Sequence, residues 1–202
     1  DNLDNMPLFI TATCSFAGYD EPGFISAGEH LLQNTEGGAV ALMTTVRAVY
    51  SGSNEPSDDY FSLLDDDEGD NLIGAIDIAV GRLPVSEAAE ALEIVNKIIH
   101  YDTSPSTLND WRSRIVMVAD DEDGNTHLNQ ADGLVVQTLN DNPDLNAHKV
   151  YLDAFPQEST PGGDRYPAVN EEIDLNMKKG ALTVTYMGHG GPNGWSQERV
   201  LG

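Results

Sequence analysis

The sequence is poor in cationic residues. Of its 202 residues, 10 are Lys or Arg and 34 are Asp or Glu, which gives a formal net charge of −24 at pH 7. A chain with this charge repels nucleic-acid phosphates and anionic lipids, so we expect it to bind neither. Carboxylates at this density either stay solvated or gather around hard cations such as Ca²⁺, which take oxygen ligands.

Cysteine is even scarcer, because Cys14 is the single one in the sequence. An internal disulfide is therefore excluded. A lone cysteine in an enzyme-sized chain is either a small buried packing residue or a nucleophile. The choice between these two interpretations depends on what surrounds Cys14.

Long apolar runs are also missing from the sequence. No run approaches the roughly 20 residues that are needed to span a bilayer, so we expect no direct membrane span. Residues Asp1–Asn5 are neither basic nor apolar, unlike the start of a signal peptide. A targeting segment is thus expected to have been removed or to lie outside this sequence.

Apolar runs and helix-period segments alternate along the chain, which predicts a single α/β domain with a largely parallel sheet covered by helices on both faces. Two segments rich in Pro, Gly and polar residues, Ser51–Asp70 and Phe155–Asp164, predict surface loops. The predicted strands are Leu8–Thr13, Ala39–Val46, Ile76–Val80, Arg114–Ala119, Lys149–Leu152 and Leu182–Met187. The predicted helices are Ala27–Leu32, Ser86–His100, His127–Leu139 and Tyr166–Lys179.

Two of the predicted strands end in chemically reactive side chains. Leu8–Thr13 runs directly into Cys14, and Leu182–Met187 is followed by Gly188 and His189. In a parallel sheet, the carboxyl ends of the strands lie at one edge, where ligands bind. A histidine beside a thiol promotes the thiolate and later protonates the leaving amine, so the pair predicts a Cys-His dyad for acyl transfer.

The residues around this pair resemble those of a known family. The segments Pro7–Cys14 and Tyr186–Leu201 resemble the gingipain-like cysteine peptidases, and are most similar to the PorU-type sortases of the type IX secretion system. Gly81–Val85 and Asp120–Asn125 extend the similarity. The resemblance implies a caspase-like fold and a cysteine endopeptidase that forms a thioester with its substrate. It also implies exported protein substrates with a C-terminal sorting signal, other secretion-system components as partners, and a secreted or cell-surface location at the outer membrane.

The resemblance assigns roles to individual residues. Cys14 corresponds to the nucleophile and His189 to the catalytic histidine. Glu122 corresponds best to the acid that orients the histidine, with Asp121 as the alternative. The oxyanion hole is made of backbone N–H groups, which correspond to those of Gly190 and Cys14.

The order of the two catalytic residues departs from the family pattern, in which the histidine precedes the cysteine. Joining Gly202 to Asp1 restores that order, so the sequence reads as circularly permuted, with its natural ends near residues 51–56. Either the chain is a permutant or it joins pieces of a longer protein. A connection that normally links the two catalytic strands is then absent, and a non-catalytic scaffold or binding domain with the same fold is the alternative function.

Acidic clusters near two glycines provide candidate cation ligands, namely Asp65, Asp67, Asp120 and Asp123. They match only part of a Ca²⁺-binding loop, and solvated loops are the alternative. The resemblance to gingipains implies structural calcium, whereas the chemistry itself requires no cofactor. His30, His100, His127 and His148 are scattered without the spacing of a zinc site, so zinc is not expected. Trp195 either lines the substrate cleft or anchors a loop.

Overall fold

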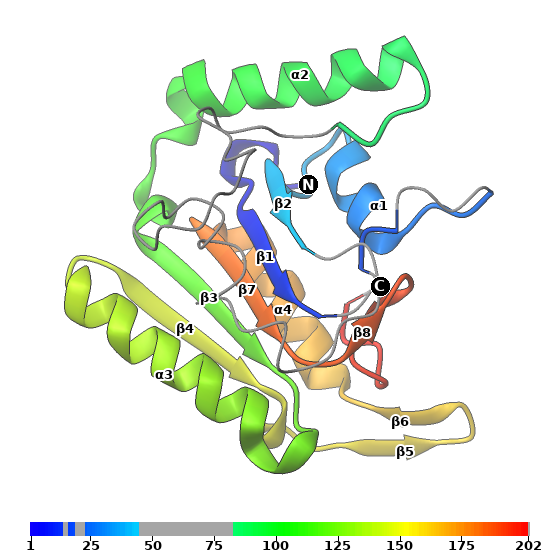
Figure 1. The fold of residues 1–202 in the computed structure, drawn as a ribbon. Coiled ribbons are helices and arrows are strands. Elements are labelled where there is room, and N and C mark those ends of the chain that lie inside the picture. Colours follow the sequence, from blue (N-terminus) through cyan, green and yellow to red (C-terminus); the bar gives the residue numbers. More distant parts are fainter. Residues whose placement is uncertain (14–15, 19–22, 45–82, 202) are drawn as a thin grey trace, which may run out of the picture.

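A five-stranded parallel sheet forms the centre of the protein in the computed structural model, which describes residues 1–13, 16–18, 23–44 and 83–201. The strand order is β2-β1-β7-β3-β4 (Figure 1). The strands are β1 (Leu8–Ala12), β2 (Ala41–Met43), β3 (Arg114–Ala119), β4 (Asn146–Tyr151) and β7 (Thr183–Met187). The predicted α/β fold with a largely parallel sheet is confirmed.

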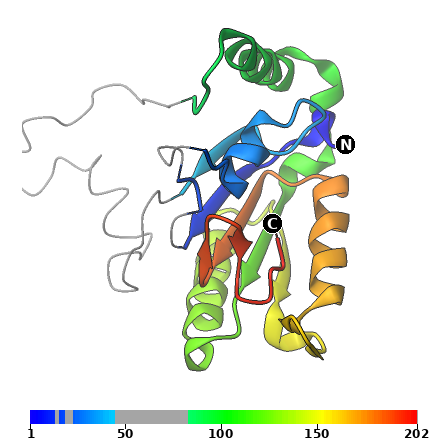
Figure 2. The same ribbon diagram turned by 90° about the vertical axis from the view of Figure 1, so that its right-hand side faces the viewer.

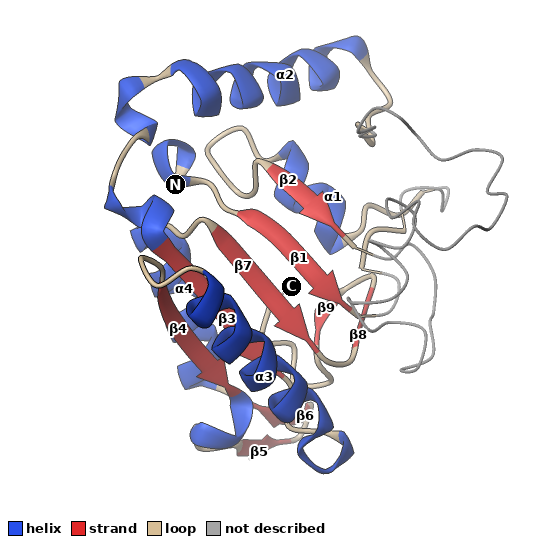
Figure 3. Cartoon of the chain, turned by 60° about the vertical axis from the view of Figure 1, so that its left-hand side comes forward, coloured by secondary structure: helices blue, strands red, loops and turns tan. Residues whose placement is uncertain are grey.

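Helices cover both faces of the sheet, as predicted. The helices are α1 (Ala27–Gln33), α2 (Ala88–Thr103), α3 (Thr126–Asp141) and α4 (Pro167–Lys179). Figure 2 shows α3 and α4 on opposite sides of the strands. α2 lies across the end of the sheet where the strands begin (Figure 3). None of the described helices is both long and apolar enough to cross a membrane.

Strand β3 shows why a continuous apolar run predicts a central strand. Val116 and Val118 belong to one hydrophobic cluster, which also contains side chains of α4. Met117 and Ala119 point the other way and pack in a second cluster against α3. Because successive side chains of a strand alternate between the two faces, a strand that is buried on both sides needs an unbroken run of apolar residues.

Local signals in the sequence account for the ends of two helices. Ser26 and Glu29 form a reciprocal capping box at the start of α1. α4 begins at Pro167 and is followed by Gly180, whose φ of 81° is unfavourable for other residues. Short 3₁₀ turns link the larger elements: η1 (Leu3–Asn5), η3 (Pro105–Thr107), η4 (Asp110–Ser113), η5 (Asp123–Asn125) and η6 (Leu152–Ala154).

The predicted loop Phe155–Asp164 is wrong in part, because most of it belongs to an exposed β-hairpin. Its strands are β5 (Glu158–Thr160) and β6 (Gly163–Arg165), which pair antiparallel. Gly163 has a φ of 102° at the first position of β6, so the glycine that suggested a loop lets the chain enter the second strand directly after the turn. The predicted strand Ile76–Val80 and the predicted loop Ser51–Asp70 lie outside the described residues.

Trp195 is an anchor of the core and does not line an open cleft. It lies in β9 (Gly194–Trp195), which pairs with β8 (Gly190–Gly191), and its side chain is 0% exposed. Its ring stacks on that of Tyr186, with centroids 4.4 Å apart. It also contacts the rings of Phe9 and Phe16. The segment that follows His189 is therefore held against the sheet by aromatic packing.

Replacing Trp195 by alanine should remove this anchor and lower the free energy of unfolding by about 3–5 kcal/mol, the cost typical of a large buried side chain. Urea denaturation measures the change. Phe24→Ala is the control, because Phe24 is 39% exposed and should change the free energy by less than about 1 kcal/mol. A similarly small effect of Trp195→Ala would contradict the packing role.

Candidate active site

The carboxyl ends of β1, β7 and β3 lie side by side at one edge of the sheet. Met187, the last residue of β7, is in register with Ala12 of β1 and with Ala119 of β3. Beyond these residues, the N–H of Gly188 donates to the carbonyl of Ala12, at 3.3 Å. The segments that follow the three strands are thereby brought together. Cys14 itself lies outside the described residues.

Asp120, directly after β3, fixes the backbone of His189. The Asp120 side chain is 1% exposed, and its Oδ2 accepts the backbone N–H of His189 at 2.8 Å. The His189 carbonyl accepts from the Tyr186 hydroxyl at 2.6 Å and from the Ser196 N–H at 2.8 Å. Gly188 allows this approach, because a Cβ at that position would collide with Asp120. Both polar groups of the His189 backbone are therefore held in place.

The buried position of Asp120 also changes its acidity. Removal from water raises the pKa of the Asp120 carboxyl to about 6, although the hydrogen bond from the His189 N–H opposes the shift. Among the described residues, the other carboxylate oxygen, Oδ1, has no hydrogen-bond partner. A buried carboxylate with one unpaired oxygen lowers the stability of the folded state, and it is typical of sites that bind an ion or a ligand.

The ring of His189 contacts a carboxylate that comes from a strained turn. Nε2 of His189 lies 3.0 Å from Oδ2 of Asp123, and the His189 side chain is 45% exposed. Asp123, Gly124 and Asn125 have φ values of 58°, 60° and 69°. Left-handed backbone is uncommon for residues other than glycine and is concentrated at functional sites. When Asp123 is ionised, it favours the tautomer with the proton on Nε2, which makes Nδ1 the basic nitrogen.

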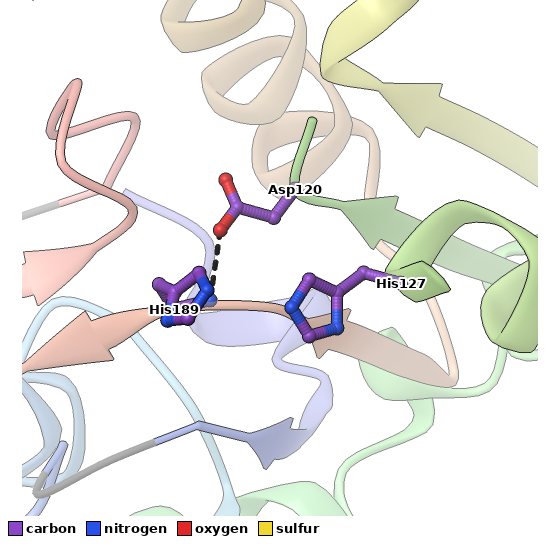
Figure 4. Close-up of side chains that lie close together, drawn as sticks. All are labelled: Asp120, His127 and His189. Carbon is purple, nitrogen blue, oxygen red and sulfur yellow. Dashed lines mark hydrogen bonds between the residues drawn. The ribbon is translucent and has the colours of Figure 1, made fainter. Parts of the chain in front are cut away.

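A second histidine lies beside the first and was not predicted as a site residue. His127, in the first turn of α3, has its ring centroid 5.2 Å from that of His189, and the two rings meet edge to face (Figure 4). Its Nε2 lies 3.4 Å from the same Oδ2 of Asp123, and its side chain is 12% exposed. Burial lowers the pKa of His127, and the neighbouring His189 lowers it further. His127 is thus favoured in its neutral form.

The predicted orienting acids occupy other positions. In the part of the chain that the structure describes, the His189 ring is hydrogen-bonded to Asp123 and not to Glu122. Glu122 is the N-cap residue of η5, and Asp121 accepts a hydrogen bond from the Tyr166 hydroxyl at 2.6 Å. The role of Glu122 stays a prediction. The sequence pattern could place the acid within Asp120–Asp123 but could not choose among four adjacent acidic positions.

Gly190, a predicted residue of the oxyanion hole, lies close to Thr13. A Cβ on Gly190 would collide with the hydroxyl of Thr13, so the absence of a side chain allows the two backbones to approach. Thr13 is the residue before Cys14 in the sequence. The oxyanion role of the Gly190 and Cys14 N–H groups stays a prediction.

Asp120 also belongs to a cluster of three carboxylates. One oxygen from each of Asp120, Asp121 and Glu198 lies within 4.8 Å of the others. The Glu198 side chain is buried and accepts from the Ser196 hydroxyl at 2.8 Å. Oδ1 of Asp121, like that of Asp120, has no partner among the described residues. Of the predicted cation ligands, Asp120 belongs to this cluster and Asp123 contacts the rings of His189 and His127. Asp65 and Asp67 lie outside the described residues.

Comparison with known proteins agrees with the resemblance seen in the sequence. The model of peptidase family C25 matches the chain in two segments, residues 1–56 and 52–202. The chain therefore belongs to peptidase family C25, the gingipain family, and is a cysteine-type peptidase. No curated protein and no solved structure matched it. The predicted gingipain-like family and α/β peptidase fold are confirmed.

The raised pKa of Asp120 predicts a pH-dependent contribution to stability. The folded state binds this proton more tightly than the unfolded state, whose aspartate has a pKa of 3.8, so stability falls as the pH rises from about 4 to about 6. Relative to Asp120→Asn, the parent chain should lose about 3 kcal/mol across that window, at 1.36 kcal/mol per pKa unit. Urea denaturation at pH 4, 5, 6 and 7 with a chelator present measures this difference. Parallel pH profiles for the two chains would contradict it.

Proposed function

We propose that this chain is a cysteine endopeptidase in which His189 acts as the general base for Cys14. The observation that carries the proposal is the pairing of β1 with β7, in which Ala12 is in register with Met187. Cys14 is two positions after Ala12 in the sequence, and His189 is two positions after Met187. Membership of a cysteine peptidase family supports the assignment. No described feature favours the non-catalytic scaffold.

The contacts of His189 suggest how the reaction proceeds. With Nε2 held by Asp123, Nδ1 takes the proton of the Cys14 thiol and leaves a thiolate beside an imidazolium. The thiolate attacks the carbonyl carbon of the scissile peptide bond. The C–N bond then breaks, the amine leaves with the proton from His189, and a thioester remains. Water or an amine then displaces the thiolate, and the enzyme is restored.

The substrates that we propose are exported proteins with a C-terminal sorting signal. The support is the similarity of Pro7–Cys14 and Tyr186–Leu201 to PorU-type sortases of the type IX secretion system. In this role the chain acts at the outer surface of the cell, with other components of the secretion system as partners. An amine acceptor for the thioester makes the enzyme a transpeptidase, whereas water makes it a signal peptidase.

We also propose that the chain is circularly permuted relative to the usual order of its family. The family model matches in two segments, and they overlap at residues 52–56. This overlap falls within the junction at residues 51–56 that the sequence predicts for a circular permutation. The two-part match supports that junction, and a single domain that spans residues 1–202 is part of the same proposal.

We also propose that Asp120, Asp121 and Glu198 bind a Ca²⁺ ion that stabilises the fold. Three carboxylates that approach within 4.8 Å repel one another unless a cation or a proton lies between them. An all-oxygen ligand set is the one that Ca²⁺ prefers. The unpartnered oxygens of Asp120 and Asp121 would then have a ligand to bind. Ca²⁺ has a structural role in this proposal and takes no part in the peptidase chemistry.

The peptidase proposal predicts different effects for the two candidate acids. Asp123→Asn should lower kcat/KM for a peptide that spans a sorting signal by about tenfold or more, since positioned acid–base groups contribute 10²–10⁴-fold. Glu122→Gln, at the adjacent position, is the matched control and should lower it by less than about threefold. Cys14→Ala should abolish cleavage and thioester formation, which mass spectrometry detects.

The outcomes separate the alternatives. If Glu122→Gln lowers the rate and Asp123→Asn does not, Glu122 is the orienting acid, as the family resemblance implies. If the parent chain neither cleaves the peptide nor reacts faster with iodoacetamide than His189→Ala does, the chain is a scaffold. Equal cleavage of a peptide that lacks the sorting signal would rule out the sortase role.

The calcium proposal predicts that Ca²⁺ raises the melting temperature. A ligand that binds only the folded state stabilises it by about 2.7 kcal/mol at 100 times its Kd. Differential scanning fluorimetry in millimolar Ca²⁺ and in chelator measures the shift. Glu198→Gln should remove most of it, whereas Glu158→Gln, on the exposed strand β5, should retain it. Identical melting temperatures with Ca²⁺ and with chelator would contradict the proposal.

A further inference from the structure

Two histidines and a buried aspartate from three different elements converge beside the candidate active site. One ligand atom from each of Asp120, His127 and His189 lies within 4.8 Å of the others (Figure 4). Asp120 follows β3, His127 belongs to the first turn of α3, and His189 follows β7. The fold therefore gathers three potential metal ligands that are far apart in the sequence.

We propose that Asp120, His127 and His189 form an inhibitory binding site for a transition-metal ion, with Zn²⁺ as the ion that fits best. Two imidazoles and a carboxylate are a common ligand set for Zn²⁺, which accepts nitrogen and oxygen donors in a tetrahedral arrangement. Ca²⁺ is a poor match for this set because it takes oxygen ligands. The site is thus distinct in chemistry from the carboxylate cluster of Asp120, Asp121 and Glu198.

The three proposed ligand atoms lie within 4.8 Å of one another, so modest movements of the side chains would give them the spacing that Zn²⁺ requires. Zn²⁺ binds its ligands at about 2.0–2.1 Å, so the ligand atoms of a tetrahedral site lie roughly 3.3 Å apart. Oδ2 of Asp123 lies 3.0 Å from Nε2 of His189 and 3.4 Å from Nε2 of His127. Asp123 is therefore placed either to join the ligand set or to orient the two rings from outside it.

A second, independent observation also points to a ligand. Asp120 is 1% exposed, and its Oδ1 has no hydrogen-bond partner among the described residues. Nε2 of His127 is also buried, and it lies 3.4 Å from Oδ2 of Asp123. Buried polar atoms are rarely left without a partner. A metal ion would supply a partner to Asp120, and the buried ring of His127 is close enough to bind the same ion.

The effect on activity rests on the proposed function. A metal ion on the His189 ring occupies a nitrogen that the peptidase reaction needs as a base, so Zn²⁺ should stop cleavage and a chelator should restore it. His127 is outside the proposed catalytic machinery. It can therefore be replaced without removing the base, and metal inhibition can be separated from catalysis.

Zn²⁺ binding can be tested first in a chain that has no peptidase activity. Isothermal titration of Zn²⁺ into the Cys14→Ala chain, with millimolar Mg²⁺ present to saturate weak carboxylate sites, should show one tight site. His127→Ala in the same background should weaken that site at least tenfold. His148→Ala is the matched control. Nε2 of His148 lies 2.8 Å from Oε1 of Glu172, and no second histidine is among its described contacts. It should leave the affinity unchanged.

Activity and spectroscopy complete the test. Without metal, His127→Ala in the Cys14 background should cleave peptide like the parent but resist concentrations of Zn²⁺ that inhibit the parent. X-ray absorption of the Zn²⁺-loaded parent should show imidazole scattering, a readout that does not depend on whether a variant folds. An affinity that is the same in His127→Ala and His148→Ala, or a metal shell without imidazole, overturns the proposal. A parent that binds Zn²⁺ but cleaves nothing refutes the peptidase function and leaves the metal site supported.

Discussion

The buried carboxylate of Asp120 is the constraint on which the rest of the site depends. It lies where β3 ends, and its Oδ2 holds the backbone N–H of His189 where β7 ends. A carboxylate that is withdrawn from water must find donors or cations, or else bind a proton. One oxygen of Asp120 has a donor, the other has none among the described residues, and Asp120 belongs to two clusters of potential ligands. The position of His189 and the two proposed cation sites therefore depend on the same carboxylate.

The arrangement also divides the histidine into a fixed part and an adjustable part. The backbone of His189 is held by Asp120, Tyr186 and Ser196, whereas its ring is 45% exposed and contacts Asp123 in an exposed turn. Groups that are preorganised by their surroundings lose less free energy when they react or bind. The ring can respond to a substrate or a metal while its point of attachment stays constant.

Much of the fold could be predicted from the sequence, because the signals are local. The apolar run of β3 and the Pro and Gly at the ends of α4 are read directly from neighbouring residues, and parallel strands bring their carboxyl ends to one edge. The partners of His189 could not be predicted in this way. Asp123 is 66 positions away and reaches the ring through three left-handed residues, and His127 is brought there by the direction of α3. The spacing of residues along the sequence reveals neither the left-handed turn at Asp123 nor the direction of α3.

Strand β7 lies between β1 and β3, so the middle of the sheet stays open until this strand is in place. The elements that it joins are remote in the chain. Asn5, just before β1, donates a hydrogen bond to the carbonyl of Lys178, which lies near the end of α4, just before β7, and is 173 positions away. Contacts of such long range close large loops and slow folding. Until β7 pairs, β1 and β3 each present an unsatisfied backbone edge, which other chains can recruit. The same topology that brings the site together late therefore makes the chain prone to aggregation while it is being synthesised.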